Sequence, residues 1–233
     1  MLAQRTWKYR VRALIRATAG EPAFNRLDAW RRWRYYRRAG VVFIHVPKAA
    51  GSTVATWLYG QRLGHHRAKD LMRESPDDWR RLRKVAVLRE PVERLLSAYT
   101  FVFDQGTEEG AIRWRPEYDD PRMRDLNYFV QSYLSTDLEG KDPVFQPQAS
   151  YVSDEGGEVA EGVECYPIHR LQQMIDSIEV SQARRPMTNS NEQPRKDRPV
   201  LDRTSREIVS RVYADDFALW HTYGRFDSAE RPD

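Results

Sequence analysis

The chain has 233 residues, of which 40% are hydrophobic and 12% aromatic, and this is enough to build the core of one domain. The single cysteine, Cys165, excludes a disulfide framework, and no apolar run approaches the ~20 residues that span a bilayer. The net charge of +4 is uneven, because residues 1–40 contain eleven Arg or Lys and only two acidic residues. We therefore expect a cytoplasmic protein without a signal peptide, in which a basic helical segment, 1–40, precedes an α/β domain, 41–233.

The basic segment is predicted to form two helices. Apolar residues recur at helical spacing in 1–17 and again, as Trp30, Trp33 and Tyr36, in 22–38. The sequence leaves open whether this segment contacts the domain itself, an acidic polymer or an anionic membrane. Membrane contact would be peripheral, on the inner face of the membrane. Nucleic acid is not expected as a partner, since no nucleic-acid-binding module is recognised.

The domain begins with alternating strands and helices. Apolar runs at 41–46 and 84–89 predict buried strands, and 162–168 is a candidate third strand. Strands that are each followed by a helix favour a parallel sheet. Helices are predicted at 90–103, 126–135 and 204–224, the last with Thr204 as its N-cap, and loops at 104–125 and 181–199.

The first strand leads into the loop 47-PKAAGST-53 and then into a predicted helix. The first N–H groups of a helix lack intrahelical partners, so a tight turn at this point favours an anion such as phosphate. Lys48 precedes Gly51, which is not the order of a Walker A loop, and there is no GxGxxG pattern. The residues that would bind the anion are Lys48, Ala49, Ala50, Gly51, Ser52 and Thr53.

The second predicted strand ends in a second cation, Arg89. Ser97 follows on the next predicted helix, which can bring its hydroxyl close to Arg89. A guanidinium and a hydroxyl together suit a second phosphate group. Arg94 is expected to point outward and to pair with Glu90, four residues earlier.

Together, VFIHVPKAAGST and VLREPVERLLSAY resemble the carbohydrate sulfotransferases, in the branch of the heparan sulfate 2-O-sulfotransferases and small bacterial relatives. The resemblance implies a P-loop-NTPase-like parallel sheet flanked by helices, and 3′-phosphoadenosine 5′-phosphosulfate as sulfuryl donor. It implies that the 47–53 loop binds the 5′ end of the donor and that Arg89 and Ser97 bind its 3′-phosphate. Ala49 and His169 depart from the residues that are common in the family.

The acceptor hydroxyl must lose a proton, and histidine is the usual base for this at neutral pH. The resemblance points to His65, which is followed five residues later by Asp70, and His66 fits that spacing less well. Lys48 would stabilise the charge that develops during in-line transfer. No metal is expected, because His and the one Cys are scattered along the chain.

We therefore expect a sulfotransferase that acts on a hydroxyl of a carbohydrate, whether a polysaccharide, a glycolipid or another glycoconjugate. Two alternatives remain: a phosphoryl transferase of the nucleotide-kinase type, and a module that binds the nucleotide without catalysis.

Overall fold

The computed structural model describes residues 27–106, 115–138, 140–178 and 199–224. Within these ranges the centre of the fold is a three-stranded parallel sheet in the order β1-β2-β3. Val42 of β1 is opposite Lys84 of β2, and Val85 of β2 is opposite Glu164 of β3. The strands are β1 Val41–Ile44, β2 Arg83–Leu88 and β3 Val163–Pro167. All three predicted strands are confirmed, and the chain has an α/β fold.

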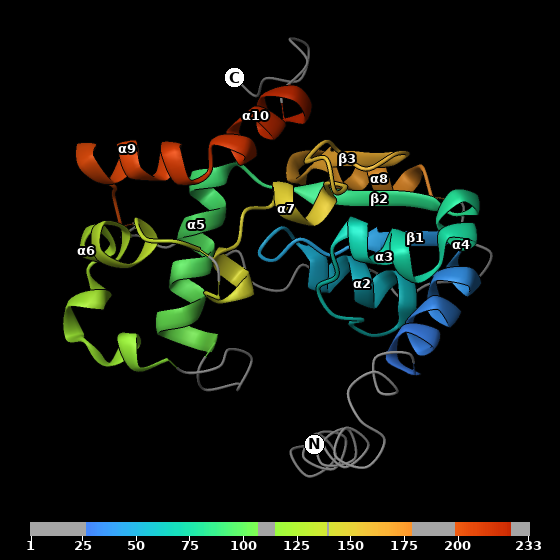
Figure 1. The fold of residues 1–233 in the computed structure, drawn as a ribbon, viewed down its shortest axis with the longest axis horizontal. Helices are drawn as coiled ribbons and strands as arrows, with labels where there is room; N and C mark the ends of the chain where they lie inside the picture. The colour runs from blue at the N-terminus through green and yellow to red at the C-terminus, as the bar shows by residue number, and fades with distance from the viewer. Residues whose placement is uncertain (1–26, 107–114, 139, 179–198, 225–233) are drawn as a thin grey trace.

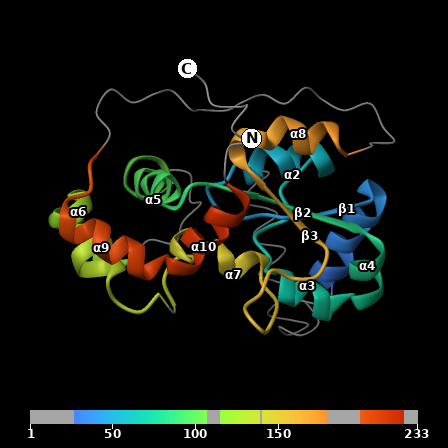
Figure 2. The same cartoon turned by 90° about the horizontal axis from the view of Figure 1, so that it is seen from above.

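Helices cover both faces of the sheet (Figures 1 and 2). One face carries α2 Gly51–Tyr59 and α8 Leu171–Asp176, and the other carries α3 Ala68–Glu74, α4 Pro76–Arg81 and α7 Ala149–Val152. Residues 27–39 form a further helix that packs Trp33 and Tyr36 into the core around the sheet. This agrees with the predicted 22–38 helix. Residues 1–26 lie outside the described ranges, and membrane contact through the basic segment stays a prediction.

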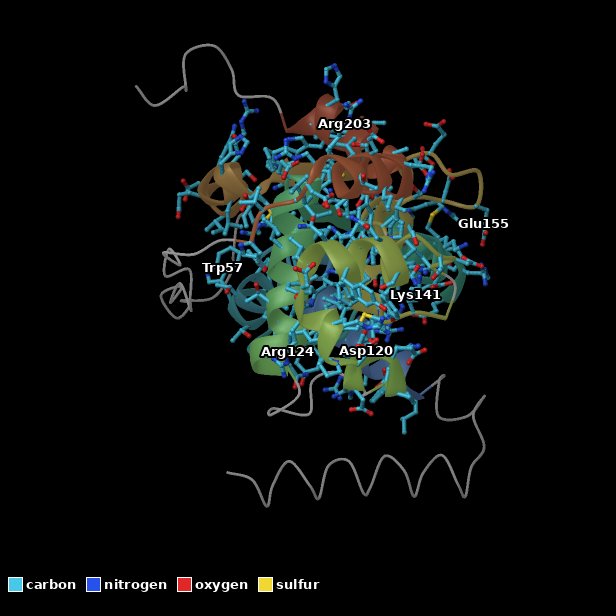
Figure 3. All side chains as sticks on the ribbon, turned by 90° about the vertical axis from the view of Figure 1, so that its left-hand side faces the viewer. Trp57, Asp120, Arg124, Lys141, Glu155 and Arg203 are labelled. Carbon is cyan, nitrogen blue, oxygen red and sulfur yellow. The ribbon has the colours of Figure 1, made fainter. Side chains whose placement is uncertain are left out.

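A second hydrophobic cluster lies beside the sheet and is built from α5 Pro91–Thr100, α6 Leu126–Phe129 and α9 Arg203–Val212 (Figure 1). Phe129 is fully buried at its centre, with rings of Phe103, Tyr133 and Phe145 around it. Figure 3 views this part from outside, with Arg203 of α9 at the top and Arg124 near the bottom. Single turns of π-helix extend α5 and α6, at Phe101–Gly106 and Val130–Leu134.

Two predicted elements differ from the structure. The predicted 204–224 helix is two helices, α9 and α10 Ala214–Tyr223, because Tyr213 leaves the helical conformation, buries its ring and donates to the Phe145 carbonyl. Its N-cap is Asp202, not Thr204.

The other difference concerns the predicted 104–125 loop. Residues 115–125 contain two short 3-10 turns that bury Tyr118 and Met123, and 107–114 lie outside the described ranges. The remaining 3-10 turns are Pro143–Phe145 and Ile168–Arg170.

Candidate functional site

The site lies at the carboxyl edge of the sheet. β1 and β2 are parallel neighbours, so the 45–50 loop and Arg89 follow their strands at the same edge. Both strands end on the side that faces α5 (Figure 1). Ligands of open α/β sheets bind at this edge. The structure therefore brings the two predicted phosphate-binding segments together.

The loop before α2 has an unusual backbone. Lys48 and Ala50 have φ angles of 65° and 58°, although neither residue is glycine. Holding a non-glycine residue in the left-handed region costs on the order of 1 kcal/mol or more. Left-handed residues in a turn direct successive N–H groups into a concave anion-binding surface. The Ala50 side chain makes no capping hydrogen bond at the start of α2.

Lys48 is the cation of this loop. Its side chain is half-buried, and Nζ lies 4.0 Å from the centroid of the Phe101 ring. Burial, followed by the positive charges of Arg89 and Arg62, lowers the pKa of Lys48 to about 8. An anion bound between these cations would relieve their repulsion.

Arg89 directly follows β2, and Ser97 lies on α5. Glu93 and Ser97 are four residues apart on α5 and share one face of that helix, and Phe101 follows four residues later in the π-helical turn that extends it. Phe101 contacts Lys48, and Ser97 lies four residues before this contact on α5. The Arg89 side chain is 14% exposed, and its Nη2 is 3.8 Å from a Glu93 carboxylate oxygen. Ser97 is half-buried.

Gln148 holds the backbone of Arg89, a role that the sequence did not suggest. Its side-chain Oε1 accepts from the Arg89 N–H at 3.1 Å, and its Nε2 donates to the Arg89 carbonyl at 2.8 Å. Gln148 is fully buried, and its own N–H donates to Asp216 at 3.0 Å. The sequence around Gln148, 147-PQAS-150, contains no pattern that predicts its contact with the Arg89 backbone.

The prediction that Arg94 points outward and pairs with Glu90 is wrong. Its side chain is completely buried and donates to Asp216 at 3.2 Å and to the Val144 carbonyl at 3.2 Å. Burial raises the pKa of Asp216, and the Arg94 charge opposes this shift. Arg94 thus supports, through Asp216 and Gln148, the segment that carries Arg89.

His65 is the histidine best placed to act as a base. Its Nδ1 lies 2.9 Å from the carbonyl oxygen of His45, which can only accept, so Nδ1 carries the hydrogen and Nε2 keeps a free lone pair. The side chain reaches solvent, yet the surrounding protein and the charge of Arg62 lower its pKa, and the His45 carbonyl partly offsets this. A neutral imidazole with an unprotonated Nε2 can accept a proton.

His66 takes part in a different set of contacts from those of His65. Its Nε2 lies 2.9 Å from a guanidinium nitrogen of Arg32 and 3.0 Å from the Leu63 carbonyl. Arg32 is buried in the helix at residues 27–39 and pairs with Glu74 at 2.5 Å. His169 packs edge-on against Trp220, with ring centroids 6.0 Å apart.

The described ranges contain neither a cluster of metal-binding side chains nor a membrane-spanning helix. These residues contain no group of three or more His, Cys, Asp or Glu side chains that could hold a metal ion. None of their helices is both long enough and apolar enough to cross a bilayer.

Comparisons of the chain with protein-family models, with curated proteins and with solved structures found no match.

Proposed function

We propose that this protein is a sulfotransferase, which moves a sulfuryl group from 3′-phosphoadenosine 5′-phosphosulfate to a hydroxyl of a carbohydrate acceptor. The observation that carries the proposal is the convergence of Lys48 and Arg89, from neighbouring parallel strands, beside a loop with two left-handed residues. Two cations at one edge of the sheet suit a ligand with phosphate groups on the 3′ and 5′ oxygens of one ribose. The sequence resemblance supplies the identity of that ligand.

The residues of the site fit this donor. Lys48 and the N-terminal amides of α2 would hold the 5′-phosphosulfate, and Ser52 and Thr53 add hydroxyls in the first turn of that helix. Arg89 and Ser97 would hold the 3′-phosphate. The acceptor hydroxyl would approach His65, on the loop between α2 and α3.

The chemistry is an in-line displacement at sulfur. His65 Nε2 would take the hydroxyl proton as the acceptor oxygen bonds to sulfur and the bond from sulfur to the 5′-phosphate oxygen breaks. Lys48 would stabilise the negative charge that grows on the departing phosphate. No covalent intermediate with the enzyme is needed.

The proposal predicts tight binding of 3′-phosphoadenosine 5′-phosphate, measured by calorimetric titration with ATP as the competing ligand. Micromolar affinity for the bisphosphate and weak binding of ATP are expected. Arg89→Ala should weaken binding roughly 10- to 100-fold, the range for loss of a charge-assisted hydrogen bond. The matched control is Arg80→Ala, because Arg80 lies on α4, its side chain is 73% exposed, and its loss should change nothing.

Two results would contradict the proposal. Equal or tighter binding of ATP would favour the kinase-like alternative, and unchanged affinity in Arg89→Ala would remove the second phosphate site.

Binding should also weaken as the pH rises through about 8, where free Lys48 loses its proton. The protonated amine attracts the anion, so affinity is full below this pKa and falls by up to tenfold per pH unit above it. His45, His65 and His66 all have lowered pKa values and are already neutral above pH 7, so they do not contribute there.

The measurement is the same titration between pH 7 and 10, with Lys48→Arg as control, since a guanidinium stays charged over this range. A pH dependence that persists in Lys48→Arg would assign the effect to another group.

A further inference from the structure

Gly51 begins α2 against the ring of His45. Its φ is not among the left-handed values of the chain, so its backbone conformation would accept alanine. A Cβ at residue 51 would nevertheless lie 1.9 Å from His45 Cδ2 and 2.3 Å from Nε2. The glycine is therefore required by the histidine ring and not by the turn.

His45 also contacts the proposed base. Its carbonyl oxygen accepts from His65 Nδ1 at 2.9 Å, and the two imidazole centroids are 4.0 Å apart, with the rings inclined by 48°. His45 itself is 5% exposed, and the Phe43 ring stacks on it at 5.9 Å. A single buried residue thus touches both the anion-binding loop and His65.

The His45 ring itself makes no hydrogen bond to the described part of the chain. Its Nδ1 is buried without a partner. Buried polar atoms without partners are rare in native proteins and call for an explanation. The charged or titratable groups that act on the ring are those of His65, Arg62 and His66, and with burial they keep it neutral.

We propose that His45 is a positioning residue, whose ring and carbonyl couple an anion bound at the 47–53 loop to the orientation of His65. The ring fills the space between the Gly51 α-carbon and the His65 imidazole, and the carbonyl fixes which His65 nitrogen is free. Movement of the loop on binding is then transmitted to the base. This role rests on the proposed function, because it takes His65 as the base.

The spectroscopic test uses side-chain ¹⁵N NMR of the full chain, which reports the tautomer of each histidine. Wild-type His65 should show one tautomer with hydrogen on Nδ1, and its signals should shift when 3′-phosphoadenosine 5′-phosphate is added. In His45→Ala the backbone carbonyl remains but the ring contact is lost, so the His65 signals should broaden and no longer respond to the nucleotide. His45→Phe keeps a flat ring and should restore the response. A wild-type response in His45→Ala, or none in His45→Phe, would overturn the proposal.

The second test is a double-mutant cycle between residues 45 and 51. Gly51→Ala should weaken nucleotide binding roughly tenfold or more, because the new methyl group displaces the ring or the loop. In His45→Ala/Gly51→Ala the ring is gone, so affinity should return to within about threefold of His45→Ala. Additive losses would show that ring and glycine are independent, contrary to the proposal.

The two failures can be told apart. If the wild-type protein binds no bisphosphate, the proposed function fails. The width of the His65 signals in the free variants still tests the contact between the His45 ring and His65, because it needs no ligand.

Discussion

Replacement of Arg94 by alanine is expected to lower the free energy of unfolding by about 3–5 kcal/mol, the range for breaking a buried ion pair. The variant leaves the Asp216 carboxylate fully buried without its cation. The backbone N–H groups of Gln148 and Ala149 still donate to it, at 3.0 and 2.9 Å. These two bonds do not replace a positive charge. Urea unfolding followed by circular dichroism measures the loss.

The pH dependence of this loss has a defined sign. Asp216 has a raised pKa in the folded protein, and removal of Arg94 raises it further. The folded variant then binds more protons than the unfolded chain, so its stability falls as the pH rises. The destabilisation should be larger at pH 8 than at pH 5.

Arg94→Met is the matched variant, because it keeps most of the aliphatic volume and removes the charge together with the hydrogen bonds to Asp216 and the Val144 carbonyl. It should retain most of the loss. If the free energy of unfolding falls by less than about 1 kcal/mol in both variants, the Arg94–Asp216 pair behaves like an exposed ion pair. This result would contradict the buried network. Because Asp216 holds Gln148, and Gln148 holds Arg89, the destabilised variants should also bind the bisphosphate less tightly.

The Arg94 network also shows where the sequence is insufficient. Glu90, four residues earlier, was the natural local partner, but it is the N-cap of α5 and accepts from the Glu93 N–H at 2.7 Å. The actual partner, Asp216, is 122 residues away in the chain. Local spacing cannot identify a partner that only the tertiary fold brings near.

Capping at α9 shows the same kind of competition. Thr204 and Asp202 are both favourable N-caps, and the structure uses Asp202, which accepts from the Ser205 N–H at 2.7 Å. Propensity alone does not decide between neighbouring candidates.

The convergence of Lys48 and Arg89, in contrast, could be predicted. Each follows a short apolar run, and the ends of parallel neighbouring strands must meet at one edge. The strain at Lys48 and Ala50 could not be predicted, because neither residue type favours a positive φ. The need for glycine at residue 51 follows from the packing of His45, which is visible only in three dimensions.

Replacement of His65 by glutamine is expected to lower sulfuryl transfer by about 10²–10⁴-fold, the range for loss of a general base. Affinity for 3′-phosphoadenosine 5′-phosphate should stay within about threefold of wild type, because Lys48 and Arg89 are intact. The measurement is single-turnover transfer of ³⁵S from labelled donor to a panel of neutral and acidic saccharides. It separates the chemical step from nucleotide binding.

His66→Gln is the matched control, since His66 contacts Arg32 and Leu63 on the structural side. It should lower stability and leave the transfer rate near that of wild type. A loss of transfer in His66→Gln with none in His65→Gln would exchange the two roles. Tight nucleotide binding without transfer to any acceptor in the wild-type protein would favour the non-catalytic alternative.

The pH profile of transfer distinguishes a base from a structural histidine. His65 must be neutral to accept a proton, so the acid limb of the rate profile should fall as the pH drops through the pKa of His65. Burial and the Arg62 charge place that pKa below the usual 6.5, so transfer should persist into mildly acidic solution. Arg62→Gln removes one of the two causes, and the acid limb of its profile should therefore move to higher pH. An acid limb that does not move would mean that a group other than His65 carries the proton.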